Sequence, residues 1–338
     1  AALQIAKNIE HDCLVVIKST VPIGTNEKVE SYIVENLSYP VNIEVASNPE
    51  FLAQGTAVND TLNASRIVIG VKSKKAEMIL REMYQGFNQP LVVTDRRSAE
   101  MIKYASNNFL ALKISYINEI ANLCEIVGAN IEDVAKGMGL DPRIGERFLQ
   151  AGVGYGGSCF PKDTKALHWL GNFNDCELKT VKAAIEVNDN QKLKLLKKSR
   201  RYYESLQGLN VAVLGLTFKP NTDDLREAPS LSNIPIFLDD GANVRAYDPV
   251  GMNNFKKLYP TEITYCSNIE ETLEGADICF IFTEWDIIKN FDVSKFSNLM
   301  RTPIIMDGRN CYSLELMAVQ DVIYESIGRK TVGKKVVN

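Results

Sequence analysis

Residues 152–167 read GVGYGGSCFPKDTKAL, and this stretch decides how the α/β segments of the chain are assigned. Gly152, Gly154 and Gly157 have the G-x-G-x-x-G spacing of a dinucleotide-binding turn. Such a turn joins a buried strand to a helix, whereas the preceding RIGERFLQA is charged and amphipathic. We therefore reject a cofactor turn here and expect a glycine loop whose backbone approaches a ligand closely.

Cys159 follows the glycines directly, and Lys162 and Asp163 lie at the predicted start of a helix over TKALHWL. A cysteine beside a cation and a helix N-terminus is a position where the thiolate is favoured. Most cysteines are structural, but the flanking glycines and charges favour a nucleophile at this one.

The composition excludes several classes of protein. The chain has 338 residues, a net charge of −4, no apolar run that could span a membrane and no visible signal peptide. Its seven scattered cysteines include no C-x-x-C pair, so neither a disulfide framework nor a metal site is expected. Cys13 and Cys279 lie in apolar runs and are expected to be buried. We expect a cytoplasmic protein that binds neither nucleic acid nor membrane.

Two regions, 1–96 and 207–330, alternate strand and helix patterns, which is typical of doubly wound parallel sheets. Strands are predicted at 13–20, 41–47, 66–71 and 90–95, and then at NVAVLGL, NVRAYDP, DICFIFT and PIIMDG. No glycine-rich turn follows the strands of 1–96. We therefore expect the C-terminal half of a Rossmann domain there, with its first half absent. Asp248 ends a strand as a ribose-binding acid would, but the signal is weak without glycines.

The region between, 97–206, is expected to be all helical. Apolar residues at every third or fourth position predict one long helix of about thirty residues, ended by Gly128. A second helix is expected over roughly 177–206, with the basic run 192–201 on a solvated face. Residues 331–338 are expected to form a tail.

Several segments resemble the nucleotide-sugar 6-dehydrogenases, the family of UDP-glucose and GDP-mannose dehydrogenases. VGYGGSCFPKD is similar to the active-site cysteine segment of that family, with a serine before the cysteine as in the UDP-glucose and GDP-mannose members. The other similar segments are KSTVPIGT at 18–25, SNPEFLAQGTA at 47–57, AEMIKYASNNFLALKISYINE at 99–119, DPRIG at 141–145, FKPNTDDLREAPS at 218–230 and DGRN at 307–310. The resemblance covers almost the whole chain. It implies two Rossmann-like domains, the first incomplete, joined by a central helical dimerisation region.

The resemblance implies an NAD-dependent, two-step oxidation of UDP-glucose to UDP-glucuronate, used in polysaccharide biosynthesis. An aldehyde releases a second hydride only after a nucleophile adds to it, and a thiolate then gives a thiohemiacetal and a thioester. By resemblance Cys159 is that nucleophile and Lys103 stabilises the oxyanion, with Asn107 one turn further along the same helix face. The residues implied for hydrolysis are the acid–base Glu50 and the water-holding Thr20 and Asp163.

The resemblance also implies the binding residues. For the substrate they are Glu50, Phe51, Leu52, Lys103, Asn107, Arg143, Phe148, Gln150, Gly152, Val153, Gly154, Tyr155, Gly156, Phe218, Lys219 and Arg309. For NAD they are Ser19, Thr20, Val21, Gln54, Cys159, Lys162 and Arg226. Arg143 is implied to reach the substrate of the neighbouring subunit, which makes the protein a homodimer.

Two departures from the family pattern leave alternatives open. Gln54 stands where many relatives carry an acidic residue, and the N-terminal G-x-G-x-x-G turn is missing. If the chain is complete, poor or no NAD binding is expected; if it is a fragment, the missing half supplies the pyrophosphate site. One alternative is a dehydrogenase of another nucleotide sugar, GDP-mannose or a UDP-N-acetyl sugar. The other is a truncated dimer module that binds a UDP-sugar without turnover.

Overall fold

The computed structural model describes residues 1–333, which form two compact units. The first is Ala1–Asn107, and the second begins at Asn108, within the long helix α5 (Arg96–Val127). Each unit is an α/β structure, as the sequence predicts. Among residues 1–333, no helix has the length and apolarity needed to cross a bilayer.

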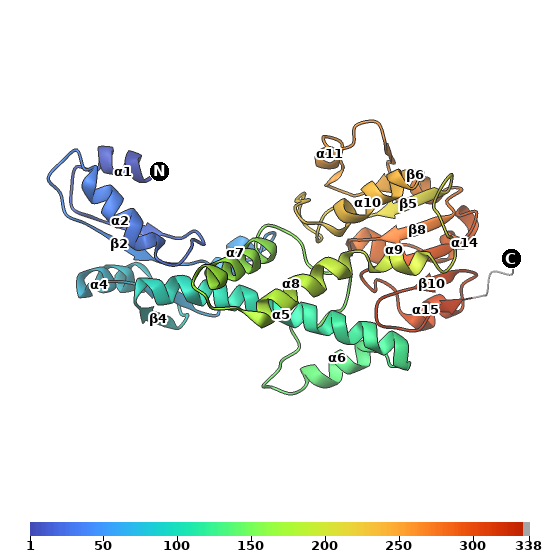
Figure 1. Ribbon diagram of the computed structural model, residues 1–338, viewed down its shortest axis with the longest axis horizontal. Helices are drawn as coiled ribbons and strands as arrows, with labels where there is room; N and C mark the ends of the chain where they lie inside the picture. Colours follow the sequence, from blue (N-terminus) through green and yellow to red (C-terminus); the bar gives the residue numbers. More distant parts are fainter. Residues whose placement is uncertain (334–338) are drawn as a thin grey trace. The chain divides into compact units, whose positions relative to one another are not determined.

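The first unit contains a four-stranded sheet in the order β1-β2-β3-β4 (Figure 1). Its elements before α5 are α1 (Ala2–Asn8), β1 (Cys13–Ile17), α2 (Thr25–Glu35), β2 (Ile43–Ser47), α3 (Ala57–Leu62), β3 (Ile67–Gly70), α4 (Lys74–Met83) and β4 (Leu91–Thr94). β1 and β2 are parallel, as are β3 and β4, whereas β2 and β3 meet antiparallel through the single pair Ser47–Gly70. All four strands coincide with predicted ones.

Both faces of the first sheet are covered, because adjacent strand residues point to opposite sides. Ala46 packs with Ile69 and Leu80 on one face, and Val45 packs with Ala6 and Ile33 on the other. The prediction that Cys13 is buried is wrong: it is exposed, since it is the first residue of β1, which lies at an edge of the described sheet. Cys279 is buried as predicted.

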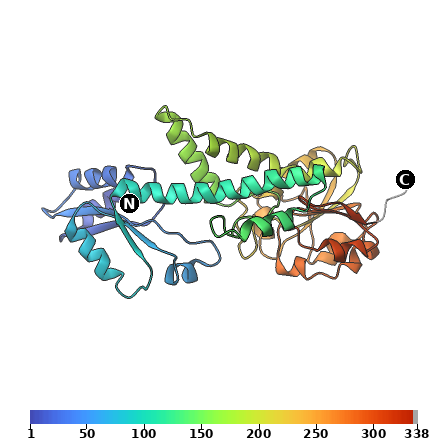
Figure 2. The same cartoon turned by 90° about the horizontal axis from the view of Figure 1, so that it is seen from below.

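The long helix α5 spans 32 residues and is continuous, as Figure 2 shows. Its buried residues are not only apolar. Alongside Ala111 and Ile117, the buried set includes polar side chains at Lys103, Asn107, Asn108, Ser115 and Asn118. Buried polar groups must be hydrogen-bonded to be tolerated, so this helix is committed to specific partners.

The rest of the helical region comprises α6 (Ile131–Gly139), α7 (Phe160–Phe173), α8 (Lys179–Lys192) and α9 (Lys194–Ser199). The single helix predicted over 177–206 is therefore wrong, because the helical path breaks at Leu193.

The predicted solvated face of 192–201 is also wrong for two of its lysines. Lys192 and Lys198 are only 5% and 3% exposed. Lys192 pairs with Glu227 at 2.7 Å, and Lys198 pairs with Glu125 at 2.9 Å and with Glu325 at 3.1 Å. Paired carboxylates allow these lysines to be buried, a feature that a run of basic residues does not reveal.

The second sheet has seven strands in the order β11-β10-β9-β8-β5-β6-β7. Its elements are β5 (Asn210–Leu214), α10 (Pro229–Asp239), β6 (Asn243–Tyr247), α11 (Met252–Phe255), β7 (Thr264–Tyr265), α12 (Ile269–Leu273), β8 (Ile278–Ile281), α13 (Asp286–Lys289), α14 (Ser294–Leu299), β9 (Ile304–Asp307), α15 (Leu314–Ala318), β10 (Ile323–Glu325) and β11 (Val332–Gly333). All its pairings are parallel except that of β10 with β11. β7, β10 and β11 are three residues or shorter and were not predicted.

Alternating strand residues fill two cores, one on each face of the second sheet. Val213 and Phe280 pack with Phe237 of α10 on one face, while Leu214 and Ile281 share the other core with Phe296 of α14. The order in which strands are added to the sheet switches sides at β5, which has β6 on one side and β8 on the other. Loops at the carboxyl ends of such strands form the usual ligand crevice of an open α/β sheet.

Asp248 has a structural role in this sheet. The residue is fully buried, and its carboxylate accepts hydrogen bonds from the backbone N–H groups of Leu216 and Gly251 and from the Trp285 indole. Because the Asp248 carboxylate is buried and already accepts hydrogen bonds from its own chain, it does not fit a ribose-binding role.

Candidate functional site

In the first unit, a buried lysine faces a glutamate. Lys103 of α5 is 3% exposed, and its Nζ lies 3.3 Å from Oε1 of Glu50, whose side chain is 26% exposed. Glu50 follows β2 and also accepts the backbone N–H of Leu52 at 3.0 Å. The structure therefore brings together the two residues that the sequence assigns to acid–base chemistry and oxyanion stabilisation.

The Phe51 ring lies next to the Lys103 ammonium. Lys103 Nζ lies 5.3 Å from the centre of the Phe51 ring, and the Arg66 guanidinium lies 4.0 Å from it. Arg66 also donates to the Ser106 hydroxyl at 3.1 Å. These contacts join the SNPEFL segment to α5 next to Asn107, which is 7% exposed.

The loop after β1 lies at the same sheet edge as Glu50, because β1 and β2 are parallel neighbours. This loop contains Ser19, Thr20 and Val21, of which Ser19 is exposed and the others are half-buried. It ends at Gly24, which precedes α2 in the left-handed conformation (φ 87°). Gln54 is exposed in the following segment.

Glu100 anchors the N-terminus of α2, a role that the sequence did not reveal. Its buried carboxylate accepts the backbone N–H groups of Gly24 at 2.5 Å and Asn26 at 2.9 Å. Glu100, Lys103 and Asn107 are spaced three and four residues apart, so they share one face of α5. No local signal reveals this role, because the partners of Glu100 lie more than 70 positions away in the sequence.

In the second unit, three amide side chains hold the glycine loop. Asn118 of α5 accepts the Gly152 N–H at 2.8 Å, and Gln191 donates to the Gly152 carbonyl at 2.7 Å. Asn188 accepts the Tyr155 N–H at 2.8 Å and donates to the Tyr155 carbonyl at 3.1 Å. None of the three was predicted, because Asn188 and Gln191 lie in a polar stretch of sequence and their burial is visible only in the structure.

The glycines are required by the protein's own packing. Gly154 and Gly157 have positive φ of 86° and 82°, as the loop interpretation requires. A Cβ on Gly156 would lie 2.5 Å from the Glu227 carbonyl oxygen, and one on Gly157 would lie 2.7 Å from the Phe218 ring. Close packing against neighbouring chain segments therefore already accounts for the absence of side chains at Gly156 and Gly157.

Cys159 lies directly after this loop, exposed, as the residue that precedes α7. Its Sγ lies 3.8 Å from the Ser158 hydroxyl oxygen. Lys162 pairs with the buried Asp163 at 2.8 Å in the first turn of the helix. Cys159 also lies close enough to Arg226 to contribute to the raised pKa of that guanidinium, whose main cause is the hydrogen bond to Asp224.

The DGRN turn after β9 joins three segments through one guanidinium. Arg309 donates to the carbonyl oxygens of Phe282 at 2.9 Å, Gly154 at 3.1 Å and Phe218 at 3.1 Å. These carbonyls belong to the glycine loop and to the loops after β5 and β8, at the point where the strand order reverses. The Lys219 ammonium lies 5.6 Å from the Phe218 ring centre.

Aromatic rings support the start of α7. The Phe160 ring packs edge-on against Phe148 at 6.1 Å and against Tyr155 at 5.7 Å. Phe148 has a positive φ of 67°, unusual for a bulky residue. Burial raises the pKa of Tyr155 to about 12, so the phenol stays protonated at neutral pH. Arg143 lies apart from these rings, 87% exposed and paired with Asp141 at 2.6 Å.

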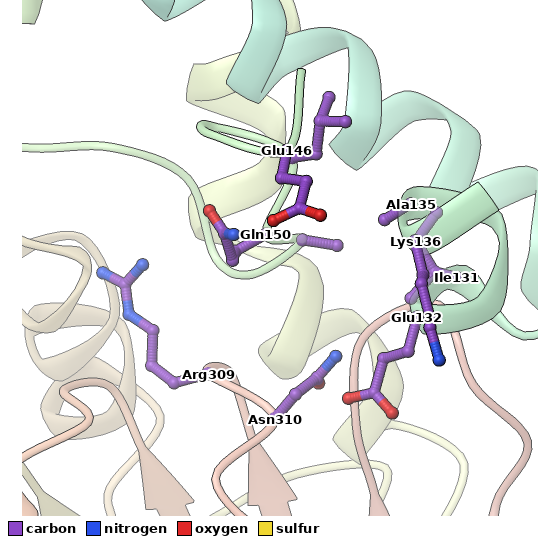
Figure 3. Close-up of a pocket in the computed structure, with 10 residues that line it drawn as sticks. Ile131, Glu132, Ala135, Lys136, Glu146, Gln150, Arg309 and Asn310 are labelled. Atoms are coloured by element: carbon purple, nitrogen blue, oxygen red, sulfur yellow. The ribbon is translucent and has the colours of Figure 1, made fainter. Parts of the chain in front are cut away.

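A hollow of about 400 Å³ lies between α6, the segment 146–151 that precedes the glycine loop, and the DGRN turn (Figure 3). Its walls are Ile131, Glu132, Ala135, Lys136, Glu146, Leu149, Gln150, Ala151, Arg309 and Asn310. Figure 3 shows the Arg309 guanidinium turned away from α6. Two predicted substrate residues, Gln150 and Arg309, thus border a cavity of the size that holds small ligands. The α6 side chains that border it were not predicted.

Mostly parallel α/β sheets with polar side chains at the carboxyl ends of their strands are the arrangement in which Rossmann-type domains bind nucleotides. Residues 1–88 match the NAD binding domain of the UDP-glucose/GDP-mannose dehydrogenase family, residues 97–190 its central domain and residues 212–314 its UDP binding domain. The chain belongs to the UDP-glucose/GDP-mannose dehydrogenase family. The match to the NAD binding domain begins at residue 1 of this chain, and the chain spans about three quarters of the length of the first relatives that it matches.

Individual relatives agree. UDP-glucose 6-dehydrogenase YwqF of Bacillus subtilis is 50% identical over 332 residues, covering 98% of this chain and 76% of that protein. UDP-glucose 6-dehydrogenase TuaD of the same organism is 44% identical, covering 98% and 72%. The structure of a UDP-glucose dehydrogenase from Pyrobaculum islandicum superposes with a TM-score of 0.90 at 35% identity, covering 97% of this chain and 74% of that one.

Proposed function

We propose that this protein oxidises UDP-glucose to UDP-glucuronate with NAD, using Cys159 as a covalent nucleophile. The observation that carries the proposal is an exposed thiol at the N-terminus of α7, between the glycine loop and the Lys162–Asp163 pair. Identities of 41% to 50% with UDP-glucose 6-dehydrogenases, over nearly the whole chain, support the substrate.

The residues implied for NAD fit its chemistry. Ser19, Thr20 and Val21 follow the carboxyl end of β1, the edge at which parallel sheets bind nucleotides. Lys162 and Arg226 have side chains that are 54% and 65% exposed, and their positive charge suits a diphosphate. Each NAD+ would accept one hydride when bound, so two NAD+ molecules would be used in turn.

The protein's own residues supply the covalent steps. Loss of a proton and a hydride from the sugar alcohol leaves an aldehyde, and the Cys159 thiolate adds to its carbon to give a thiohemiacetal. Lys103 balances the negative charge on the oxygen. Loss of the second hydride leaves a thioester, which water opens to release the carboxylate and the thiol. Glu50 takes the proton of that water, which Thr20 and Asp163 orient.

The nucleotide part of the substrate has a place in the second unit. We expect it to bind along 148–156 with Phe218, Lys219 and Arg309, and to enter the hollow beside Gln150. The UDP binding domain match over 212–314 supports a UDP-sugar. Because Arg309 already donates to three carbonyls, its expected role is to hold these loops at the ligand.

The direct test is the stoichiometry of turnover. Purified protein incubated with UDP-glucose and excess NAD+ should form two NADH for each UDP-glucuronate, because each substrate loses two hydrides before the thioester is opened. GDP-mannose and UDP-N-acetylglucosamine serve as controls. Faster turnover of either control would reassign the substrate. Saturable UDP-glucose binding in calorimetry without NADH would support the non-catalytic module.

We further propose that the protein is a homodimer formed through α5 and α7. Phe109, Tyr116 and Leu123 are 63%, 48% and 52% exposed, and their seven-residue spacing places them on one helix face. On α7, Trp169 and Phe173 are exposed and stack at 5.1 Å. Such exposed apolar rows favour a second copy of the chain, to whose substrate the exposed Arg143 would reach.

Tyr116→Asp should convert the dimer to a monomer, because a buried, unpaired carboxylate at the centre of the row opposes association. Analytical ultracentrifugation measures the change. Val319→Asp, at a residue that is 80% exposed but outside this row, is the matched control and should leave the mass unchanged. A dimer that persists in Tyr116→Asp argues for a different interface.

The cytoplasm is the proposed compartment. All seven cysteines are free thiols, as expected in a reducing environment.

A further inference from the structure

We propose that Glu227 is a positioning residue for Cys159, holding the 226–227 backbone against the glycine loop and against α7. The inference rests on the proposed role of Cys159 as the nucleophile. The sequence alone assigns no role to Glu227.

The Glu227 carboxylate bridges two helices. It accepts Lys165 of α7 at 2.8 Å and Lys192 of α8 at 2.7 Å. Lys165 lies six residues after Cys159 on the helix that Cys159 precedes. These two lysines lower the pKa of Glu227 to about 2, so the carboxylate is charged throughout the physiological range.

The burial of Lys192 restricts where the Glu227 carboxylate can lie. It is 6% exposed, and its other carboxylate contact, Asp189, lies at 3.9 Å. A buried ammonium needs a close counter-charge, so the Lys192 position strongly favours one placement of Glu227. The exposed Lys165 then ties α7 to that placement.

The backbone of the same residue touches the cysteine loop. Glu227 has a positive φ of 55°, a conformation that costs a non-glycine residue energy and persists only when its surroundings enforce it. Its carbonyl oxygen lies where Gly156 has no room for a Cβ, and the neighbouring Arg226 carbonyl accepts the Gly157 N–H at 2.7 Å. The loop that ends at Cys159 is thus fixed by a strained segment that the side-chain bridge holds in place.

The same segment contains Arg226, whose guanidinium carries a positive charge. Arg226 interacts electrostatically with Cys159 and is itself held by Asp224 at 2.7 Å. The segment that packs against the glycine loop therefore also carries a charged side chain that interacts with Cys159. Release of the Glu227 bridge should let residues 226–227 separate from the loop and withdraw that cation from Cys159.

The test compares Glu227→Gln with Glu270→Gln. Glu270 is a matched control, since it pairs with Lys295 at 2.7 Å and is 44% exposed against 38% for Glu227. Alkylation by iodoacetamide is followed at each cysteine by peptide mass spectrometry, without substrate. The exposed Cys13 and Cys176 are internal references. Glu227→Gln should change the alkylation rate of Cys159 by about threefold or more relative to Cys176, because the loop that ends at Cys159 loses the segment that fixes its backbone.

A second measurement, the rate of each of the two oxidation steps, separates a positioning role of Glu227 from a general effect on stability. In Glu227→Gln, turnover of the UDP-aldehyde intermediate should fall about tenfold or more with little change in KM, because small misplacement of a reacting group is costly. Oxidation of the alcohol should fall less, since it precedes attack by Cys159. A merely structural residue would lower both rates together.

Lys165→Met supports the test if Glu227→Gln does not fold, because it removes the tie to α7 and keeps the buried Lys192–Glu227 pair. Wild-type alkylation of Cys159 in the folded variant, with or without a lower melting temperature, would overturn the proposal. The alkylation assay needs no turnover. It therefore remains decisive if UDP-glucose proves not to be the substrate, and that failure would appear separately in the NADH assay.

Discussion

Cys159→Ser should abolish formation of UDP-glucuronate, lowering kcat for the complete reaction by at least about 1,000-fold. A serine hydroxyl is far less ionised than a thiol at neutral pH, so it adds poorly to the aldehyde. Any ester formed in place of a thioester is also opened more slowly. The reaction should stall after the first hydride or with an adduct on residue 159.

The stoichiometry of a single turnover measures this directly. With enzyme in excess, wild type should give two NADH per UDP-glucose, and Cys159→Ser one or fewer, with the aldehyde or adduct detected by mass spectrometry. Cys176→Ser is the control, since Cys176 is also exposed but lies in none of the groups described above. Normal product formation by Cys159→Ser would rule out a covalent mechanism through this residue.

Much of the fold could be predicted because it follows from local periodicity. The four strands of the first sheet and the main strands of the second are apolar runs, and α5 has an unbroken helical pattern. β7, β10 and β11 are too short to show a pattern, and their pairing depends on neighbours distant in sequence. The break at Leu193 was missed because no Gly or Pro marks it.

The candidate site also contains some residues that the sequence predicts and others that only the structure reveals. Cys159 was predicted from its flanking glycines and charges as well as from the family resemblance, and Lys103 from the resemblance. The roles of Glu100, Glu227 and Lys192 were found only in the structure. Glu100 and Glu227 look like surface carboxylates in the sequence, and Lys192 looks like part of a solvated basic run. Their roles arise from pairings between residues 35 to 76 positions apart, which no local pattern contains.

Lys103→Met should lower kcat by about 100- to 1,000-fold, the usual effect of removing a group that stabilises an oxyanion. The argument depends on burial. Lys103 is 3% exposed and lies 3.3 Å from Glu50, so solvent screens its charge little. Methionine is an unbranched side chain of similar length, so the substitution removes the ammonium, including its contact with the Phe51 ring, without opening a large cavity.

The variant should fold, because the carboxylate it leaves without a cation is 26% exposed and still accepts the Leu52 N–H. Melting temperature and the binding constant for UDP-glucose check this. Lys74→Met, at an 89% exposed lysine paired with Glu77 in the same unit, is the control. A loss in Lys103→Met no larger than in Lys74→Met would remove Lys103 from the chemistry. A loss in binding with kcat preserved would make it a ground-state contact, because only interactions stronger in the transition state raise kcat.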